Sequence, residues 1–177
     1  HFNNPHGLPD ETHYTTANDM AKIAKAAWFN PLFRKFVTRE YFEIPPTNMQ
    51  PETRYLLNHH QMMEGRDHAY EGVLGGKTGY TTVAGSTLVT FAKRGNTILL
   101  CVVLNSVNGA YSDTAALLDY GFNNFEKVAL DLDKEPVPLE ILPCEKYLLN
   151  NCGNTYPFYY QRRVYVTVPT GTNVTKL

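Results

Sequence analysis

The stretch "YEGVLGGKTGYTTVAGSTLVTF", Tyr70 to Phe91, decides the fold, because it places glycines and a lysine inside sequence that otherwise favours strands. Gly72 to Tyr80 and Gly85 to Arg94 contain the β-branched and aromatic residues typical of strands and are joined by "TTVA". A third such segment, Thr97 to Val107, follows after "GN". Connections this short are typical of hairpins, so we expect three antiparallel strands paired in sequence order.

Helices are expected both before and after these strands in the sequence. Thr15 to Phe29 has the threonine-x-x-acid spacing of a capping box at its start and an apolar face, which predicts a helix that Asn30-Pro31 ends. "PLFRKFVT" predicts a short second helix, and "REYFEIPP" predicts a strand. Ala110 to Phe125 carries one apolar stripe, so we expect a helix that packs on one face of the sheet.

The segment from Thr47 to Ala69 shows no clean period, and we interpret it as a long excursion with one turn of helix around Arg54 to Leu57. It carries a group of histidines and acids: His59, His60, Glu64, Asp67 and His68. Their spacing matches no zinc signature or pair on a helix face, so we interpret this part as a solvated loop.

Composition limits the function. The 177 residues suffice for one full core and a small appendage. Sixteen basic and 17 acidic residues give a net charge of −1 without a basic run, which argues against nucleic acid as a partner. The longest apolar run, Ile98 to Leu104, is too short to span a bilayer, and Cys101 inside it is expected to be a small buried hydrophobe. Cys144 and Cys152 could form a disulfide or stay reduced.

The texture of the sequence changes after residue 126. From Lys127 onward strand-like segments alternate with prolines and turn pairs, without a helical pattern. We therefore expect residues 1–126 to form an α+β unit and residues 127–177 to begin a small all-β unit. The chain opens in turn-rich sequence without an initiator methionine, and we interpret it as a fragment.

Lys77 and Thr78 stand among glycines on the first of the three strands. Glycines let another backbone approach closely, while an ammonium group and a hydroxyl project from the strand. An extended peptide could add to this strand, with its terminal carboxylate held by Lys77 and Thr78. The amide of Tyr80 could donate to an oxyanion. The alternative is that Lys77 only blunts an edge strand.

The segment "GGKTGYTTVAGSTLV" resembles the third signature element of penicillin-binding serine peptidases and their β-lactamase relatives. Three further segments are similar, in order and spacing, to the low-molecular-mass D-alanyl-D-alanine carboxypeptidases: "FNNPHGLPDETHYTTANDMAKIA", "IPPTNMQPETRYLLNHHQMM" and "DTAALLDYGFNNF". The resemblance covers residues 2–125 and is specific, because several separate motifs appear in the right order.

The resemblance implies the C-terminal part of a transpeptidase-like domain, an antiparallel sheet with helices, followed by the start of a small β-rich domain. It implies an extracytoplasmic serine peptidase of cell wall biogenesis that acts on peptidoglycan stem peptides ending in D-Ala-D-Ala and is acylated by penicillins and other β-lactams, with no cofactor or metal. Lys77, Thr78 and Gly79 would bind the substrate, Tyr80 would give the oxyanion amide, and His6 in "NPHGL" would lie near the mouth of the site. A membrane association through a segment after Leu177 stays open.

In the family that this sequence resembles, the nucleophile is the serine of an S-x-x-K motif, and a second serine lies in an S-x-N motif. Here "TFAK" at residues 90–93 would place its ends on opposite faces of a strand, and "SVN" at 106–108 follows the lysine strand instead of preceding it. An arginine expected at position 110 is replaced by Ala110. We therefore expect the nucleophile and base upstream of His1 and no activity in this chain alone. The alternative is a non-catalytic module that binds peptidoglycan peptides or is purely structural.

Overall fold

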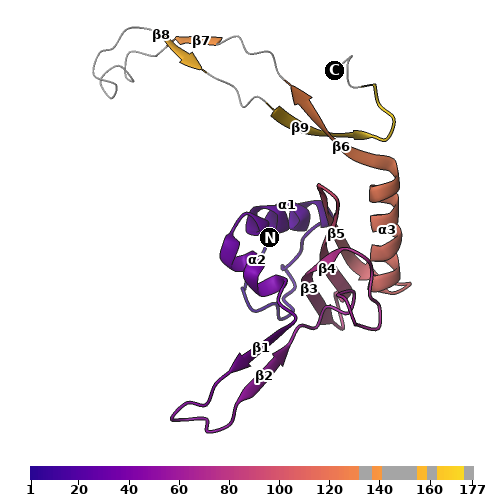
Figure 1. Ribbon diagram of the computed structural model, residues 1–177. Coiled ribbons are helices and arrows are strands. Elements are labelled where there is room, and N and C mark those ends of the chain that lie inside the picture. Colours follow the sequence, from indigo (N-terminus) through magenta and orange to yellow (C-terminus); the bar gives the residue numbers. More distant parts are fainter. Residues whose placement is uncertain (132–136, 141–154, 159–162, 174–177) are drawn as a thin grey trace. The chain divides into compact units, whose positions relative to one another are not determined.

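The computed structural model describes residues 1–131, 137–140, 155–158 and 163–173. The chain divides into two compact units, His1–Asn124 and Phe125–Leu177. The elements, labelled in Figure 1, are α1 (Ala17–Trp28), α2 (Pro31–Val37), β1 (Tyr41–Ile44), β2 (Arg54–Leu57), β3 (Val73–Thr81), β4 (Gly85–Arg94), β5 (Thr97–Ser106), α3 (Ala110–Asn124), β6 (Phe125–Asp131), β7 (Val137–Glu140), β8 (Thr155–Phe158) and β9 (Arg163–Pro169).

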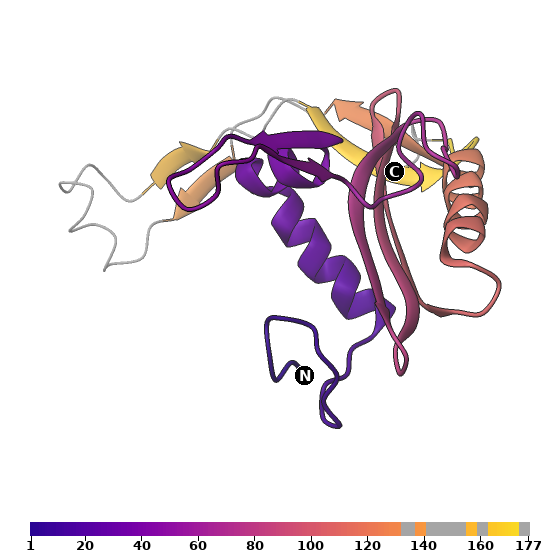
Figure 2. The same ribbon diagram turned by 90° about the horizontal axis from the view of Figure 1, so that it is seen from below.

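The first unit is built on the antiparallel sheet that the sequence predicts, with strand order β3-β4-β5. Figure 2 shows α1 and α2 on one side of this sheet and α3 on the other. Because β4 lies between β3 and β5, both of its edges are paired. The helices and the three strands confirm the α+β architecture expected from the sequence.

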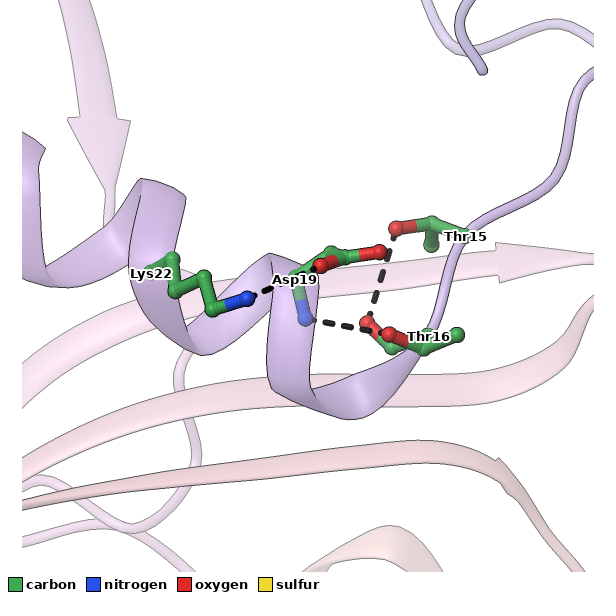
Figure 3. Close-up of polar contacts among 4 residues, drawn as sticks. All are labelled: Thr15, Thr16, Asp19 and Lys22. Atoms are coloured by element: carbon green, nitrogen blue, oxygen red, sulfur yellow. Dashed lines mark hydrogen bonds and ion pairs between the residues drawn. The ribbon is translucent and has the colours of Figure 1, made fainter.

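The two N-terminal helices begin at side-chain caps. Thr16 caps α1, since its Oγ1 accepts a hydrogen bond from the amide of Asp19 at 3.1 Å, and the Asp19 carboxylate lies 3.6 Å from the Lys22 amine (Figure 3). Asn30 caps α2 in the same way and Pro31 occupies the first turn of that helix. The Asn30-Pro31 pair that ends α1 therefore also starts α2.

The turn of helix expected around residues 54–57 is wrong, because Arg54–Leu57 forms strand β2. It pairs antiparallel with β1, from Tyr41 opposite Leu57 to Ile44 opposite Arg54, and the hairpin extends away from the rest of the unit in Figure 1. Thr47 and Gln50 exchange backbone hydrogen bonds of 2.8 and 3.3 Å that turn the chain back. A single turn of helix closes too few hydrogen bonds to offset its nucleation cost, whereas β1 offers partners along the whole segment.

Each face of the sheet has its own core. On the α3 side, Leu118 packs among Leu88, Ala92 and Cys101, which confirms the predicted packing of the α3 stripe. Cys101 is a free, buried thiol, as expected, and burial raises its pKa to about 11. On the other side, the Phe91 ring stacks on that of Trp28 with 4.2 Å between the ring centroids.

The loop before β3 is not simply solvated, because His60 is buried within it. The side chain is 1% exposed, and its Nε2 lies 2.9 Å from the Oγ1 of Thr90, which is 0% exposed. The Met62 amide donates to Nδ1 at 3.4 Å, so the neutral ring carries its proton on Nε2. Both ring nitrogens have partners, which is why the imidazole can be buried. Burial lowers the pKa of His60 to about 4.

In the second unit, β6 pairs antiparallel with β9 and β7 with β8. The amine of Lys127 lies 4.6 Å from the centre of the Tyr165 ring, and Val168 is buried. Cys144 and Cys152 lie outside the described residues. Among the helices that the structure describes, none combines the length and apolarity needed to cross a bilayer.

Replacing Phe91 by alanine should lower the free energy of unfolding by about 3–5 kcal/mol, because the ring is buried against Trp28 and its loss leaves a cavity. Chemical denaturation followed by circular dichroism measures this loss. The matched control is Phe36→Ala on α2, where the ring is 63% exposed, and we expect a change of less than about 0.5 kcal/mol there. Equal losses in the two variants would contradict the assigned core.

Acid should destabilise the protein partly through His60. Its pKa is lowered from 6.5 to about 4 on folding, so the unfolded chain binds more protons between these values. The stabilisation from the neutral ring is complete above pH 6.5 and is lost as the pH falls toward 4, by up to about 3 kcal/mol. Denaturation curves at several pH values should therefore fall more steeply for the wild type than for His60→Gln, which does not titrate. Parallel curves would disprove this assignment.

Candidate functional site

Strand β3 is the edge of its sheet. In residues 1–131 and the shorter described segments, it pairs with β4 alone, with Lys77 opposite Val89 and Tyr80 opposite Ser86. No described strand pairs with its other edge. An extended peptide can pair with such an edge through main-chain hydrogen bonds.

Lys77 and its neighbours present polar groups along this strand. The Lys77 side chain is exposed, and its amine donates to the carbonyl oxygen of Thr78 at 2.5 Å. Thr78 is half-buried, and Tyr80 is 74% exposed. An ammonium group beside a hydroxyl can bind a carboxylate by charge-assisted hydrogen bonds. At Gly79 an added Cβ would lie 2.5 Å from the Thr87 hydroxyl, so a side chain at that position would require Thr87 to shift.

Two further glycines let the start of β3 lie against its neighbours. Gly75 and Gly76 have φ angles of +139° and +158° and are buried. A Cβ on Gly75 would lie 2.1 Å from the Val37 carbonyl oxygen at the end of α2, and one on Gly76 would lie 1.9 Å from that of Val89 on β4. Only glycine permits these contacts, which place the backbone directly before Lys77.

Asn58 and His60 belong to this site, although sequence reasoning did not assign them to it. The Asn58 amide donates to the carbonyl oxygens of Val37 at 3.2 Å and Arg39 at 3.0 Å, and its oxygen accepts from the His60 amide at 3.0 Å. The His60 ring reaches Gly76, where an added Cβ would lie 3.1 Å from the ring carbon Cδ2. The segment "LLNHHQMM" was part of the family resemblance, but nothing in one sequence indicates which of its polar residues turn inward.

The structure does not join His6 to the lysine strand. His6 is exposed, and its Nδ1 accepts a hydrogen bond from the Leu8 amide at 3.2 Å. In the described part of the chain this contact of His6 is local to its loop, so its place near the site stays a prediction. Within that same part, no group of three or more histidine, cysteine, aspartate or glutamate side chains converges on a point where a metal could bind.

Neither of the two short motif matches, "SVN" at residues 106–108 and "TFAK" at residues 90–93, forms a catalytic arrangement in the structure. The Ser106 hydroxyl donates to the Asp113 carboxylate at 2.6 Å and accepts from the Gly109 amide at 3.0 Å, which holds the start of α3. Thr90 is buried, while Lys93 is exposed, so their side chains do not form a pair. Ala110 is buried at the first position of α3.

The sequence pattern of the D-alanyl-D-alanine carboxypeptidase family matches residues 1–108. The chain is 32% identical over 129 residues to the D-alanyl-D-alanine carboxypeptidase DacB2 of Mycobacterium tuberculosis, covering 69% of this chain and 42% of that protein. It is 33% identical over 127 residues to the D-alanyl-D-alanine carboxypeptidase DacF of Bacillus subtilis, covering 71% of this chain and 31% of that protein. The chain thus spans less than half the length of these relatives.

Solved structures give the same relationship. A mutant of the Streptomyces K15 DD-transpeptidase aligns with a TM-score of 0.59 at 29% identity, over 69% of this chain and 47% of that one. The D-alanyl-D-alanine carboxypeptidase DacD of Francisella tularensis aligns with a TM-score of 0.60 at 24% identity, over 96% of this chain and 51% of that one, which supports the fold alone. Since the family pattern covers more than half of its residues, the chain belongs to the D-alanyl-D-alanine carboxypeptidase family.

Proposed function

We propose that this chain is part of a longer serine-type D-Ala-D-Ala carboxypeptidase that trims peptidoglycan stem peptides outside the cytoplasm and is acylated by penicillins. The proposal rests on one observation above all. A member of this family presents Lys77 and Thr78, exposed and half-buried respectively, on the edge strand β3, whose outer side no described strand covers.

In the proposed complex, the stem peptide adds to β3 as an extended strand and its terminal carboxylate lies against Lys77 and Thr78. The Lys77 amine now donates to the Thr78 carbonyl oxygen of its own strand. A substrate carboxylate replaces this neutral acceptor with a charged one, and charge-assisted hydrogen bonds are about twice as strong as neutral ones. The amide of Tyr80 donates to the oxyanion that forms on the attacked carbonyl.

The reaction needs an activated nucleophile, and the sequence contains no serine-x-x-lysine to provide one. In the proposal, a serine from the rest of the protein attacks the carbonyl carbon between the two D-Ala residues, the peptide bond breaks and D-Ala leaves with a proton. Water then hydrolyses the ester and regenerates the serine. Penicillins follow the first step, with the β-lactam amide bond opening in place of the peptide bond. Residues 127–177 are proposed to begin the β-rich domain after the catalytic one.

Replacing Lys77 by alanine in the full-length protein should slow acylation by a fluorescent penicillin about 10–100-fold, because a hydrogen bond to a charged group contributes about 1.5–3 kcal/mol. The labelling rate on gels measures the effect. Lys93→Ala is the matched control, because this lysine is also exposed, on the neighbouring strand β4, but lies outside the proposed contact. An unchanged rate in the Lys77 variant would remove its anchoring role.

The coding sequence upstream of the His1 codon should contain serine-x-x-lysine followed by serine-x-asparagine, since acyl transfer needs an activated hydroxyl. Sequencing the complete gene tests this. If both motifs are absent there, the protein is a non-catalytic module that binds peptidoglycan peptides or is purely structural.

A further inference from the structure

We propose that His60 is a positioning residue: together with Thr90 and Asn58 it holds the backbone of Gly76, and thereby Lys77, in the geometry that acylation requires. The inference rests on the proposed function, because it assigns a role to His60 in that same site. His60 touches no reacting atom in this proposal and acts only through β3.

The first step of the argument is the register of the sheet. Thr90 on β4 is the direct cross-strand partner of Gly76 on β3. The His60 Nε2 lies 2.9 Å from the Thr90 Oγ1, so the imidazole is fixed to the residue that faces Gly76. The ring then lies against Gly76 itself, within 3.1 Å of the position that a Cβ would take. The imidazole thus supports the strand one residue before Lys77.

The second step is the anchoring of the loop that carries His60. The Asn58 side chain bonds the backbone of His60 on one side and the carbonyl oxygens of Val37 and Arg39 on the other. The same Val37 oxygen is the group that approaches Gly75. The end of α2, the loop and β4 therefore enclose the two glycines through one connected set of contacts.

The third step is that the Lys77 side chain has little to place it besides the backbone of its own strand, which pairs with β4. Its side chain is exposed, and its amine donates a hydrogen bond to the adjacent residue of its own strand. Glycines have no side chains of their own to pack, so neighbouring groups must fix their backbone. A misplacement of about 1 Å in a reacting geometry can reduce a rate about 100-fold. Loss of the imidazole should accordingly displace Lys77.

A buried polar pair also stabilises a core, so the test must separate placement from stability. Four variants of the full-length protein serve: His60→Leu, His60→Gln, Thr90→Val and Thr114→Val. Glutamine can still donate a hydrogen bond to Thr90, whereas leucine cannot. Thr114→Val is the control for Thr90→Val, because both threonines are fully buried and the Thr114 hydroxyl lacks a hydrogen-bond partner of normal geometry in the described structure.

Labelling with a fluorescent penicillin gives two quantities, the fraction of protein that reacts and the rate at which it reacts. We expect His60→Leu and Thr90→Val to react at least about 10-fold more slowly with an unchanged reactive fraction. His60→Gln should recover most of the rate, and Thr114→Val should match the wild type. A smaller reactive fraction that reacts at the wild-type rate would show a role in stability alone and overturn the inference.

Hydrogen exchange measured by mass spectrometry gives a readout independent of activity. In His60→Leu and Thr90→Val, the peptide covering residues 73–81 should exchange at least about 10-fold faster, while that covering residues 97–106 should not change. Equal acceleration of both peptides, or of neither, would overturn the inference. Thr90→Val is nearly isosteric, so it provides the test even if His60→Leu does not fold.

The two proposals can fail separately. If the wild-type protein forms no adduct with penicillin, the proposed function fails, and the exchange rates of residues 73–81 alone decide whether His60 positions β3. If the wild type reacts and Lys77→Ala slows it, but the His60 and Thr90 variants behave as the wild type, the proposed function stands and the positioning role is excluded.

Discussion

The structure of the first unit depends on the close approach that two glycines allow. The backbone at Gly75 and Gly76 passes between the end of α2 and β4, so near to both that a single Cβ at either position would lie about 2 Å from a carbonyl oxygen. Any side chain there would push β3 away from its neighbours. Because Lys77 follows directly, the same contacts that complete the fold also place the cation that defines the candidate site.

Much of this arrangement could be predicted from local sequence. The antiparallel order of β3, β4 and β5 follows from connections too short for anything but hairpins, and the start of α1 follows from the spacing of Thr16 and Asp19. The residues around Lys77 likewise indicated the strand that we propose to bind the substrate. These features depend on neighbours in sequence, which is why a single chain suffices to indicate them.

The remainder depends on partners distant in sequence. Residues 54–57 form a strand because they pair with β1, and no local sequence pattern predicts that pairing. His60 looked like one solvated histidine among three, since its burial depends on Thr90, 30 residues further along the chain. The sequence could therefore indicate the group proposed to contact the substrate, but it could not identify the residues proposed to hold that group in place.

The choice of a neutral imidazole beneath β3 has an electrostatic reason. A buried cation behind Gly76 would place a second positive charge near Lys77, and the desolvation of that charge would be costly. Burial lowers the pKa of His60 to about 4, so near neutral pH the ring donates one hydrogen bond and accepts another without carrying charge. The two roles therefore fall to different groups. The neutral pair of His60 and Thr90 fixes the backbone, and the exposed ammonium of Lys77 remains the charge that a substrate carboxylate would meet.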